Sequence, residues 1–166
     1  MKNPNKKIPK ELLISALFTG LLCGLWAGFA DYLFLNVWAG FAGCTAYFAT
    51  GKHNLQALII TITTTLVGAL MAFLMIILET KTFGFIGGPI AGTLGVGSLV
   101  AIIVLLGINK WLSFVPGMFV GCYTFFAIDG MNDGNWLTLC LSLTVGAILG
   151  YCCDIGGSKL GKKLSY

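Results

Sequence analysis

Phe41-Ala-Gly-Cys-Thr-Ala-Tyr-Phe-Ala49 occurs a second time, 78 positions later, as Phe119-Val-Gly-Cys-Tyr-Thr-Phe-Phe-Ala127. The same offset, without a gap, brings Val67-Gly-Ala69 onto Val145-Gly-Ala147. Between residues 39–72 and 117–150, nine of 34 aligned positions are identical. Apolar composition alone would give roughly a third of that number. The sequence therefore indicates an internal duplication, in which each copy holds an apolar segment with Gly-Cys at its centre.

The composition is typical of an integral membrane protein. Hydrophobic residues make up 57% of the 166 residues and charged residues only 10%, and the mean hydropathy is +0.92, which excludes an ordinary soluble domain. All ten basic residues are lysines, and the formal charge of +4 resides almost wholly at the ends of apolar segments. Such charges orient a chain in a membrane and do not indicate nucleic-acid binding.

Six apolar segments are candidates for membrane-spanning helices, which need roughly 20 apolar residues to cross the bilayer core. They are Leu12 to Ala30, Tyr32 to Thr50, Leu55 to Leu78, Phe83 to Ile108, Trp111 to Ile128, and Trp136 to Cys153. The second and fifth form a short pair at matching positions of the duplication. We interpret the first as a membrane anchor, because it is longer than a signal-peptide core and lacks a good cleavage site. Since lipid cannot satisfy an unpaired backbone, the predicted fold is an all-α polytopic membrane helical bundle.

The lysines predict the orientation of this bundle. Six spans leave Lys81 alone on one side of the membrane and put nine lysines on the other, which are Lys2, Lys6, Lys7, Lys10, Lys52, Lys110, Lys159, Lys162 and Lys163. Lysine-rich ends are typical of the cytoplasmic side, so both termini are expected there. If both short segments instead turned back inside the membrane, Lys52 and Lys110 would change sides.

The duplication and the spans together divide the chain. We expect a basic cytoplasmic tail at 1–11, a first membrane repeat at 12–80, a second membrane repeat at 81–155 and a second basic cytoplasmic tail at 156–166. Three spans per repeat is an odd number, so the second copy enters the membrane from the opposite side. The sequence thus predicts a 3+3 inverted repeat with short second and fifth segments, an arrangement whose solute site lies near the midplane between the copies.

Aromatic and hydroxyl side chains that match between the repeats are candidates for the lining of a solute pathway. Rings can narrow such a pathway and hydroxyls can bind a solute. The candidates are Phe41, Thr45, Tyr47, Phe48, Thr64, Phe119, Tyr123, Thr124, Phe125, Phe126 and Ser142. The alternative is that these side chains only fill contacts between helices. Helix packing is also the first interpretation of two glycine stripes, Gly20 with Gly24 and Gly28, and Gly84 with Gly88 and Gly92.

No catalytic or cofactor-binding motif is evident. The chain has no HExxH, no Ser-His or Cys-His pairing and no buried acid pair, so we expect neither an enzyme nor a cofactor or metal. The six cysteines fall inside or at the edge of apolar runs and are interpreted as small buried residues. His53 is interpreted as a solvated residue at the membrane edge, and a gating or pH-sensing role is the alternative. The loop from Asp129 to Asn135 lacks two ligands of a calcium loop and is predicted to be a turn.

Two blocks resemble a known family. Trp38-Ala-Gly-Phe-Ala-Gly-Cys-Thr-Ala-Tyr-Phe-Ala49 and Leu112-Ser-Phe-Val-Pro-Gly-Met-Phe-Val-Gly-Cys122 are similar to the signature segments of the YcdZ-like bacterial inner-membrane proteins, a domain-of-unknown-function family. The resemblance covers most of the chain, from the first span to the sixth. It implies a multi-pass protein of the bacterial cytoplasmic membrane, and it carries no assigned activity.

The functional prediction is a channel or facilitator for a small neutral or weakly ionising solute. No Asp, Glu, Lys or Arg lies at mid-membrane depth in the predicted spans, whereas proton relays and ion-coupled carriers usually keep one there. Two alternatives stay open. One is a non-transporting membrane scaffold or accessory subunit, and the other is a secondary transporter coupled to ions through Asp31, Asp154 or Glu79. The expected partners are membrane lipids, the solute and further copies of the chain in a homo-oligomer.

Overall fold

Helices are the only regular secondary structure in the part of the chain that this computed structural model describes, residues 8–131 and 135–165. The α-helices are α1 (Lys10–Phe29), α2 (Val37–Ala49), α3 (Leu55–Ile77), α4 (Gly88–Leu106), α5 (Val115–Ala127) and α6 (Asn135–Ser165). A short 3-10 turn, η1 (Asp31–Leu33), follows α1, and a π-helical turn, η2 (Leu78–Thr82), extends α3. Lys2, Lys6 and Lys7, which were assigned to the cytoplasm, lie outside the described residues, and so do residues 132–134 of the predicted turn.

Caps and prolines decide where the helices begin. The side chain of Asn36 accepts a hydrogen bond of 2.9 Å from the backbone N–H of Ala39 at the start of α2, and Asn54 does the same for Ala57 at the start of α3, at 2.8 Å. These are standard N-caps. α4 and α5 each carry a proline in the first turn, where its missing N–H costs nothing. α2, α4 and α5 therefore start later than the apolar runs that predicted them.

The second and fifth helices are much shorter than the predicted spans. α2 and α5 have 13 residues each, or about 20 Å at 1.5 Å per residue, against about 30 Å for a hydrocarbon core. The predicted boundaries at 32 and 111 were wrong because η1 and the Asn36 cap delay α2, and the loop over 107–114 delays α5. Four helical stretches, at α1, α3 with η2, α4 and α6, are long and apolar enough to span a membrane.

The sixth helix is longer than predicted. α6 has 31 residues and continues to Ser165, through most of the region predicted as a basic tail. Lysine favours helix and no proline interrupts the segment. Gly156, Gly157 and Gly161 let α1 approach this end closely, because a Cβ at each would meet Phe18, Ser15 or Glu11 of α1.

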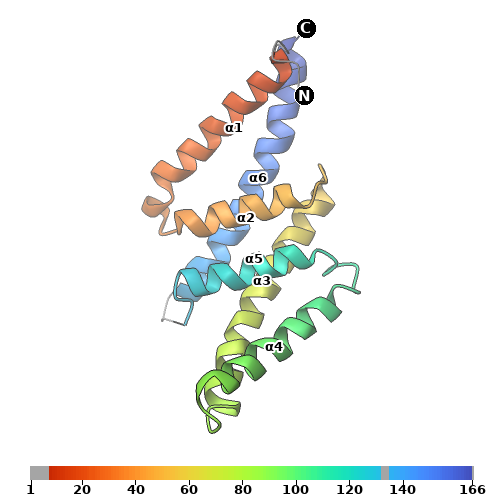
Figure 1. Cartoon of the computed structure of the whole chain (residues 1–166). Helices are drawn as coiled ribbons and strands as arrows, with labels where there is room; N and C mark the ends of the chain where they lie inside the picture. Colours follow the sequence, from red (N-terminus) through yellow and green to blue (C-terminus); the bar gives the residue numbers. More distant parts are fainter. Residues whose placement is uncertain (1–7, 132–134, 166) are drawn as a thin grey trace, which may run out of the picture.

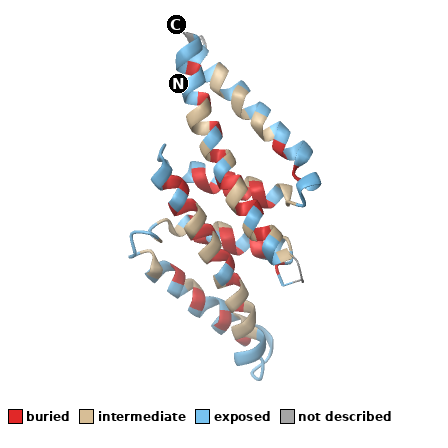
Figure 2. Cartoon of the chain, turned by 180° about the vertical axis from the view of Figure 1, so that it is seen from behind, coloured by how far each residue is buried: buried red, intermediate tan, exposed pale blue. Residues whose placement is uncertain are grey.

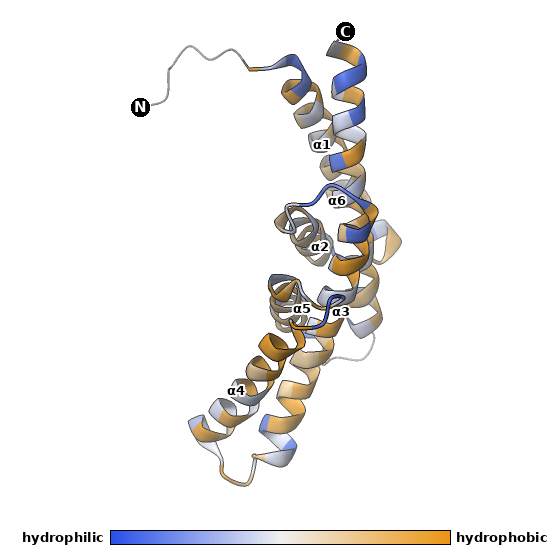
Figure 3. Ribbon diagram, turned by 90° about the vertical axis from the view of Figure 1, so that its right-hand side faces the viewer, coloured by the Kyte–Doolittle hydropathy of each residue, from blue (hydrophilic) through white to orange (hydrophobic). Residues whose placement is uncertain are grey.

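Two short helices lie side by side at the centre of the molecule (Figure 1). α2 and α5 run in opposite directions, nearly horizontally in that view, and α3 and α6 cross behind them. α1 packs against α6, and α4 packs against α3 and η2. Seen from the side, α2 and α5 form one layer on α3 and α6 (Figure 3). Successive connections alternate between the two edges of the view, so each helix reverses the direction of the one before.

The buried residues gather where α2, α3, α5 and α6 cross (Figure 2). Met118, Phe125, Leu139 and Leu143 are fully buried there. α1 and α4 keep most of their apolar side chains exposed, and the most hydrophilic residues lie mainly at helix ends and in loops (Figure 3). A helix that is apolar on all sides suits lipid contact and not water. The architecture is therefore that of a helical integral membrane protein.

Candidate functional site

Glycines set the closest approaches between the short and the long helices, and they do so in matched pairs. A Cβ on Gly43 of α2 would stand 3.0 Å from the backbone nitrogen of Ala147 in α6, and one on Gly121 of α5 would stand 2.8 Å from that of Ala69 in α3. The offset that aligns Phe41 with Phe119 also relates Gly43 to Gly121 and Ala69 to Ala147. Backbones touch at these positions, so no conduit passes through them.

A second pair of crossings shows the same pattern, here with the glycine on the long helix and its neighbour on the short helix. A Cβ on Gly68 of α3 would stand 2.6 Å from the carbonyl carbon of Met118 in α5, and one on Gly146 of α6 would stand 2.6 Å from that of Gly40 in α2. The same offset relates these two pairs. Each short helix thus packs on the long helix of the other predicted repeat, with matching positions in contact.

The aromatic contacts follow the same rule. Tyr47 lies edge-on to Tyr151 with 5.9 Å between the ring centroids, and Phe125 lies edge-on to Phe73 with 6.5 Å. Edge-to-face rings at such distances stabilise a contact beyond their buried area. Tyr47 and Phe125 are both almost fully buried. Of the candidate pathway residues, these two rings serve as packing.

The buried hydroxyls among the candidates are already hydrogen-bonded within the protein. Thr64 donates to the carbonyl of Ile60 at 2.7 Å, and Thr124 donates to the carbonyl of Val120 at 2.7 Å. This back-bonding is the usual way in which a helix satisfies a buried threonine. Ser142 accepts a hydrogen bond of 2.8 Å from the backbone N–H of Asn36. These hydroxyls serve the structure of the bundle, and none of them points into a described hollow.

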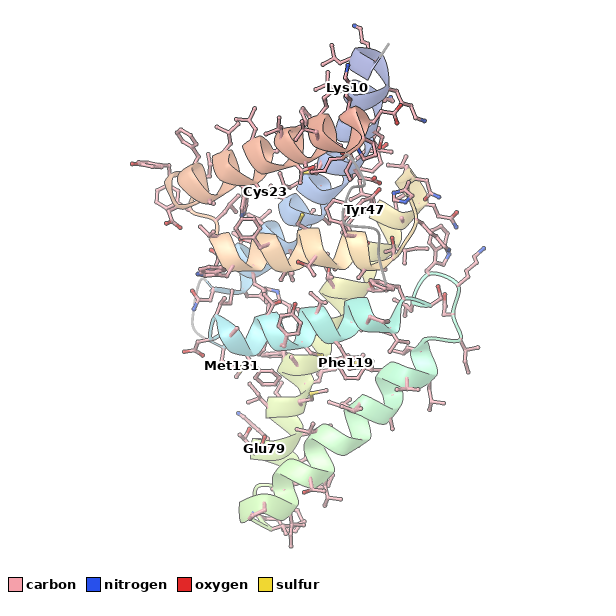
Figure 4. All side chains as sticks on the ribbon, turned by 45° about the horizontal axis from the view of Figure 1, so that its top comes forward. Lys10, Cys23, Tyr47, Glu79, Phe119 and Met131 are labelled. Carbon is pink, nitrogen blue, oxygen red and sulfur yellow. The ribbon has the colours of Figure 1, made fainter. Side chains whose placement is uncertain are left out.

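The remaining candidates lie on the outer faces of the two short helices. Phe41 is half-buried, and the exposed ones are Thr45, Phe48, Phe119, Tyr123 and Phe126. Those of α5 line one side of an open groove of about 270 Å³ between α3, α4 and α5, whose lining is Met75, Val96, Val100, Phe119, Cys122, Tyr123 and Phe126. Figure 4 places Phe119 on the side of α5 that faces α4. The matching residues of α2 line no part of this groove, so the predicted aromatic pairs do not meet across it.

The exposed hydroxyl of Tyr123 is not part of the groove wall, which is wholly apolar. Within the described part of the chain, the hydroxyl of Tyr123 makes no hydrogen bond, and neither does that of Thr45, its match on α2. A hydroxyl facing hydrocarbon without a partner is unfavourable. Water, a solute or a neighbouring protein is the partner that such a group requires.

A polar cluster that the sequence did not reveal joins α2, the α2–α3 loop and α6. The hydroxyl of Tyr47 donates to a carboxylate oxygen of Asp154 at 2.9 Å, and Nδ1 of His53 lies 2.8 Å from both oxygens of that carboxylate. The side chain of Asp154 is only 9% exposed, and that of His53 is 72% exposed. The interpretation of His53 as merely solvated was incomplete. The two residues lie far apart in the sequence, and the only hint was an acid directly after Cys153.

The cysteines differ in exposure. All six are free thiols; Cys44, Cys122 and Cys153 are buried and Cys152 is exposed. Cys122 donates to the carbonyl of Gly68 at 3.0 Å. Among the described residues, no three side chains of His, Cys, Asp or Glu gather as metal ligands would.

Comparisons with known proteins converge on one family. Residues 16–158 match the family described as "Protein of unknown function (DUF1097)". The chain is 37% identical over 155 residues to "Inner membrane protein YcdZ" of Escherichia coli (strain K12), covering 92% of this chain and 89% of the relative. It is 35% identical over 158 residues to the protein of the same name from Salmonella typhimurium (strain LT2), covering 92% and 91%. No solved structure matches the chain significantly.

Proposed function

The chain belongs to the DUF1097 family of membrane proteins of unknown function, and we propose that it is a facilitator for a small neutral or weakly ionising solute in the bacterial inner membrane. The observation that carries the proposal is that the helix crossings of one repeat recur at the matching positions of the other. Duplicated bundles with short matched helices at their centre are a recurrent architecture of membrane transport proteins.

The proposed arrangement is six membrane passes in two inverted repeats, α1–α3 and α4–α6. It is supported by the antiparallel course of α2 and α5 and by the alternation of the connections between two edges (Figure 1). A slanted helix needs more residues to cross a bilayer than an upright one. When α2 and α5 are set perpendicular to the membrane plane, the longer helices are tilted from that perpendicular. Their greater lengths are consistent with this tilt.

The proposed orientation puts both termini in the cytoplasm. The α2–α3 and α4–α5 loops, which hold Lys52 and Lys110, lie at one edge of Figure 1, and the α1–α2 and α5–α6 connections, which hold Asp31 and Asp129, lie at the other. Lysine-rich connections favour the cytoplasmic side. The edge with the lysines is therefore assigned to the cytoplasm.

The proposed route follows the α5 groove. Its walls carry no charge and are wholly apolar, with Phe119 and Phe126 among the lining residues. Such a lining suits a neutral solute better than an ion. The groove is open along its length, so we propose that a second copy of the chain covers it in a homo-oligomer and that the route lies between copies.

Swelling of proteoliposomes tests this function. Vesicles with the purified protein are exposed to urea, glycerol, short amides, ammonia and short carboxylic acids in turn, and re-swelling is compared with that of empty vesicles. The function predicts faster re-swelling for at least one solute. Phe126→Trp should slow it several-fold by filling the groove, and Phe48→Trp, the matching position on α2, should not. No acceleration for any solute would reject a facilitator.

A scaffold is the second candidate, and one observation favours it. A Cβ built on Gly20, Gly24 or Gly28 of α1 would meet nothing within 4 Å, so this glycine stripe is not used inside the chain. Small-residue stripes let another helix approach closely. A scaffold predicts a stoichiometric partner that co-purifies with the wild type and is lost in Gly24→Leu. Uptake that collapses on addition of an uncoupler would instead favour an ion-coupled transporter.

A further inference from the structure

The two predicted repeats match in their crossings but differ sharply at one place. When the repeats are aligned as above, the polar cluster has an apolar counterpart, and the matched pairs are Tyr47 with Phe125, His53 with Met131, and Asp154 with Ile76. Ring contacts are kept, since Tyr47 packs edge-on to Phe48 as Phe125 does to Phe126, with 5.7 Å between centroids in each case. Packing thus explains the aromatic residues that both repeats share at these positions. The ionisable groups His53 and Asp154 occur in only one of the two matched places.

The carboxylate of Asp154 is held between a buried and an exposed donor. Tyr47 approaches from the interior, and its side chain is almost fully buried. His53 approaches from the loop and bridges both carboxylate oxygens at 2.8 Å. Figure 4 shows Tyr47 at the end of α2 where that helix meets α6 and the start of α3. The cluster therefore ties three segments together through one carboxylate.

Few other charged groups face this carboxylate. On α6 itself Tyr151 packs on Tyr47, and the hydroxyl of Ser158 bonds the backbone carbonyl of Asp154. On the loop, Lys52 is exposed beside His53. On α1, Glu11 lies against Gly161, two turns further along α6, and the first two turns of α3, over 55–62, carry no ionisable side chain. Among the described residues, His53 is thus the one basic side chain that pairs with Asp154.

We propose that His53 and Asp154 form a proton-binding site that holds the α2–α3 loop on α6 when His53 is protonated and releases it when the proton leaves. The site lies at the edge that carries Lys52 and Lys110, and the opposite edge has Met131 and Ile76 in its place. The protein therefore responds to the pH on one side of the membrane only. The inference does not depend on any solute route, so it stands or fails separately from the facilitator.

The direction of the response follows from the charges. An imidazole takes up a proton between pH 5 and 8, and a carboxylate stays ionised through most of that range. With His53 protonated the pair carries opposite charges, and with His53 neutral only a hydrogen bond from the imidazole to the carboxylate remains. Because His53 is largely exposed, solvent screens the pair and the loop equilibrium should shift by only about three- to five-fold. Loop release therefore increases as the pH rises.

Limited tryptic digestion of the full-length protein in detergent micelles measures this release. Trypsin cuts after Lys52 in the α2–α3 loop and after Lys110 in the α4–α5 loop, and the ratio of the two initial rates, read by mass spectrometry, cancels the pH dependence of trypsin itself. In the wild type, we expect the Lys52-to-Lys110 ratio to rise about threefold from pH 6 to pH 8. An unchanged ratio would overturn the proposal.

Three variants distinguish loop release by the His53–Asp154 pair from a direct effect of His53 on trypsin cleavage of the neighbouring bond. Asp154→Asn keeps His53 next to the cut bond but removes the charge, and its ratio should be independent of pH; the wild-type rise in this variant would overturn the proposal. His53→Gln should also be independent of pH, and it decides the matter if Asp154→Asn does not fold. Asp31→Asn, the same change at a carboxylate outside the cluster, should keep the threefold rise.

Discussion

Alanine in place of Gly68 should destabilise the protein far more than alanine in place of Gly24. Both are glycines inside helices, and in both an alanine adds one methyl group. At Gly68 the new Cβ would lie closer than 3.0 Å to the backbone of Met118, a separation that real Cβ atoms essentially never show, whereas at Gly24 nothing lies within 4 Å. The two variants therefore share the intrinsic effect on helix formation and differ only in the packing between helices.

The magnitude follows from what has to move. The obstruction at Gly68 is the backbone of α5 and not a flexible side chain, so α3 and α5 have to separate by about 1 Å, which forfeits a quarter to a half of the contact energy along the crossing. Overpacking costs roughly 1–3 kcal/mol even where side chains can yield, so we expect about 3 kcal/mol for Gly68→Ala. For Gly24→Ala we expect a gain of up to about 1 kcal/mol from helix propensity.

Unfolding of the purified variants in mixed micelles, followed by circular dichroism against the fraction of denaturing detergent, gives both free energies. Gly146→Ala provides an internal replicate, because its Cβ would meet the backbone of Gly40 in the matched crossing, and its loss should equal that of Gly68→Ala within about 1 kcal/mol. Equal stabilities for Gly68→Ala and Gly24→Ala would refute the reasoning from close helix crossings.

Three further changes have defined outcomes. Asn36→Ala should lower the free energy of unfolding by about 1 kcal/mol, since the N-cap bond to Ala39 is lost, and chemical denaturation against the Asn36→Asp control, which keeps a cap, checks it. Tyr47→Phe should cost about 1.5 kcal/mol in the same assay, because the buried carboxylate of Asp154 loses a donor; no loss would contradict that bond. A lipid-soluble maleimide should label Cys152, which is exposed, within minutes, and mass spectrometry that finds no label there would contradict its exposure.

Composition and the internal match predicted the class of the fold because both depend on many residues at once. The long apolar stretches at α1, α3 and α4 were placed to within a few residues. Hydropathy averaged over a whole span changes little with the identity of any single residue. The match between Gly43 and Gly121 pointed to positions where the backbones do approach closely. These features were accessible because they are local or periodic in the sequence.

Other features were not accessible because they depend on side-chain geometry or on contacts across the chain. A single cap at Asn36 shortens α2 by several residues, and hydropathy does not register it. The hydroxyl of Thr64, a lining candidate, bonds the carbonyl of Ile60, a contact that the sequence pattern does not show. The pairing of His53 with Asp154 joins segments that only the packing of α2 on α6 brings together.

The number of membrane passes is tested most directly by the sidedness of the short helices. Single cysteines at Asp31 and His53 flank α2, and at Asn109 and Met131 they flank α5, each in a variant whose native cysteines are replaced by serine; all four positions are exposed. Labelling with an impermeant maleimide in sealed, oriented vesicles should reach positions 53 and 109 from the cytoplasmic side and positions 31 and 131 from the other side. If the two ends of α2, or those of α5, react from the same side, the short helices do not cross and the inverted six-pass arrangement is wrong.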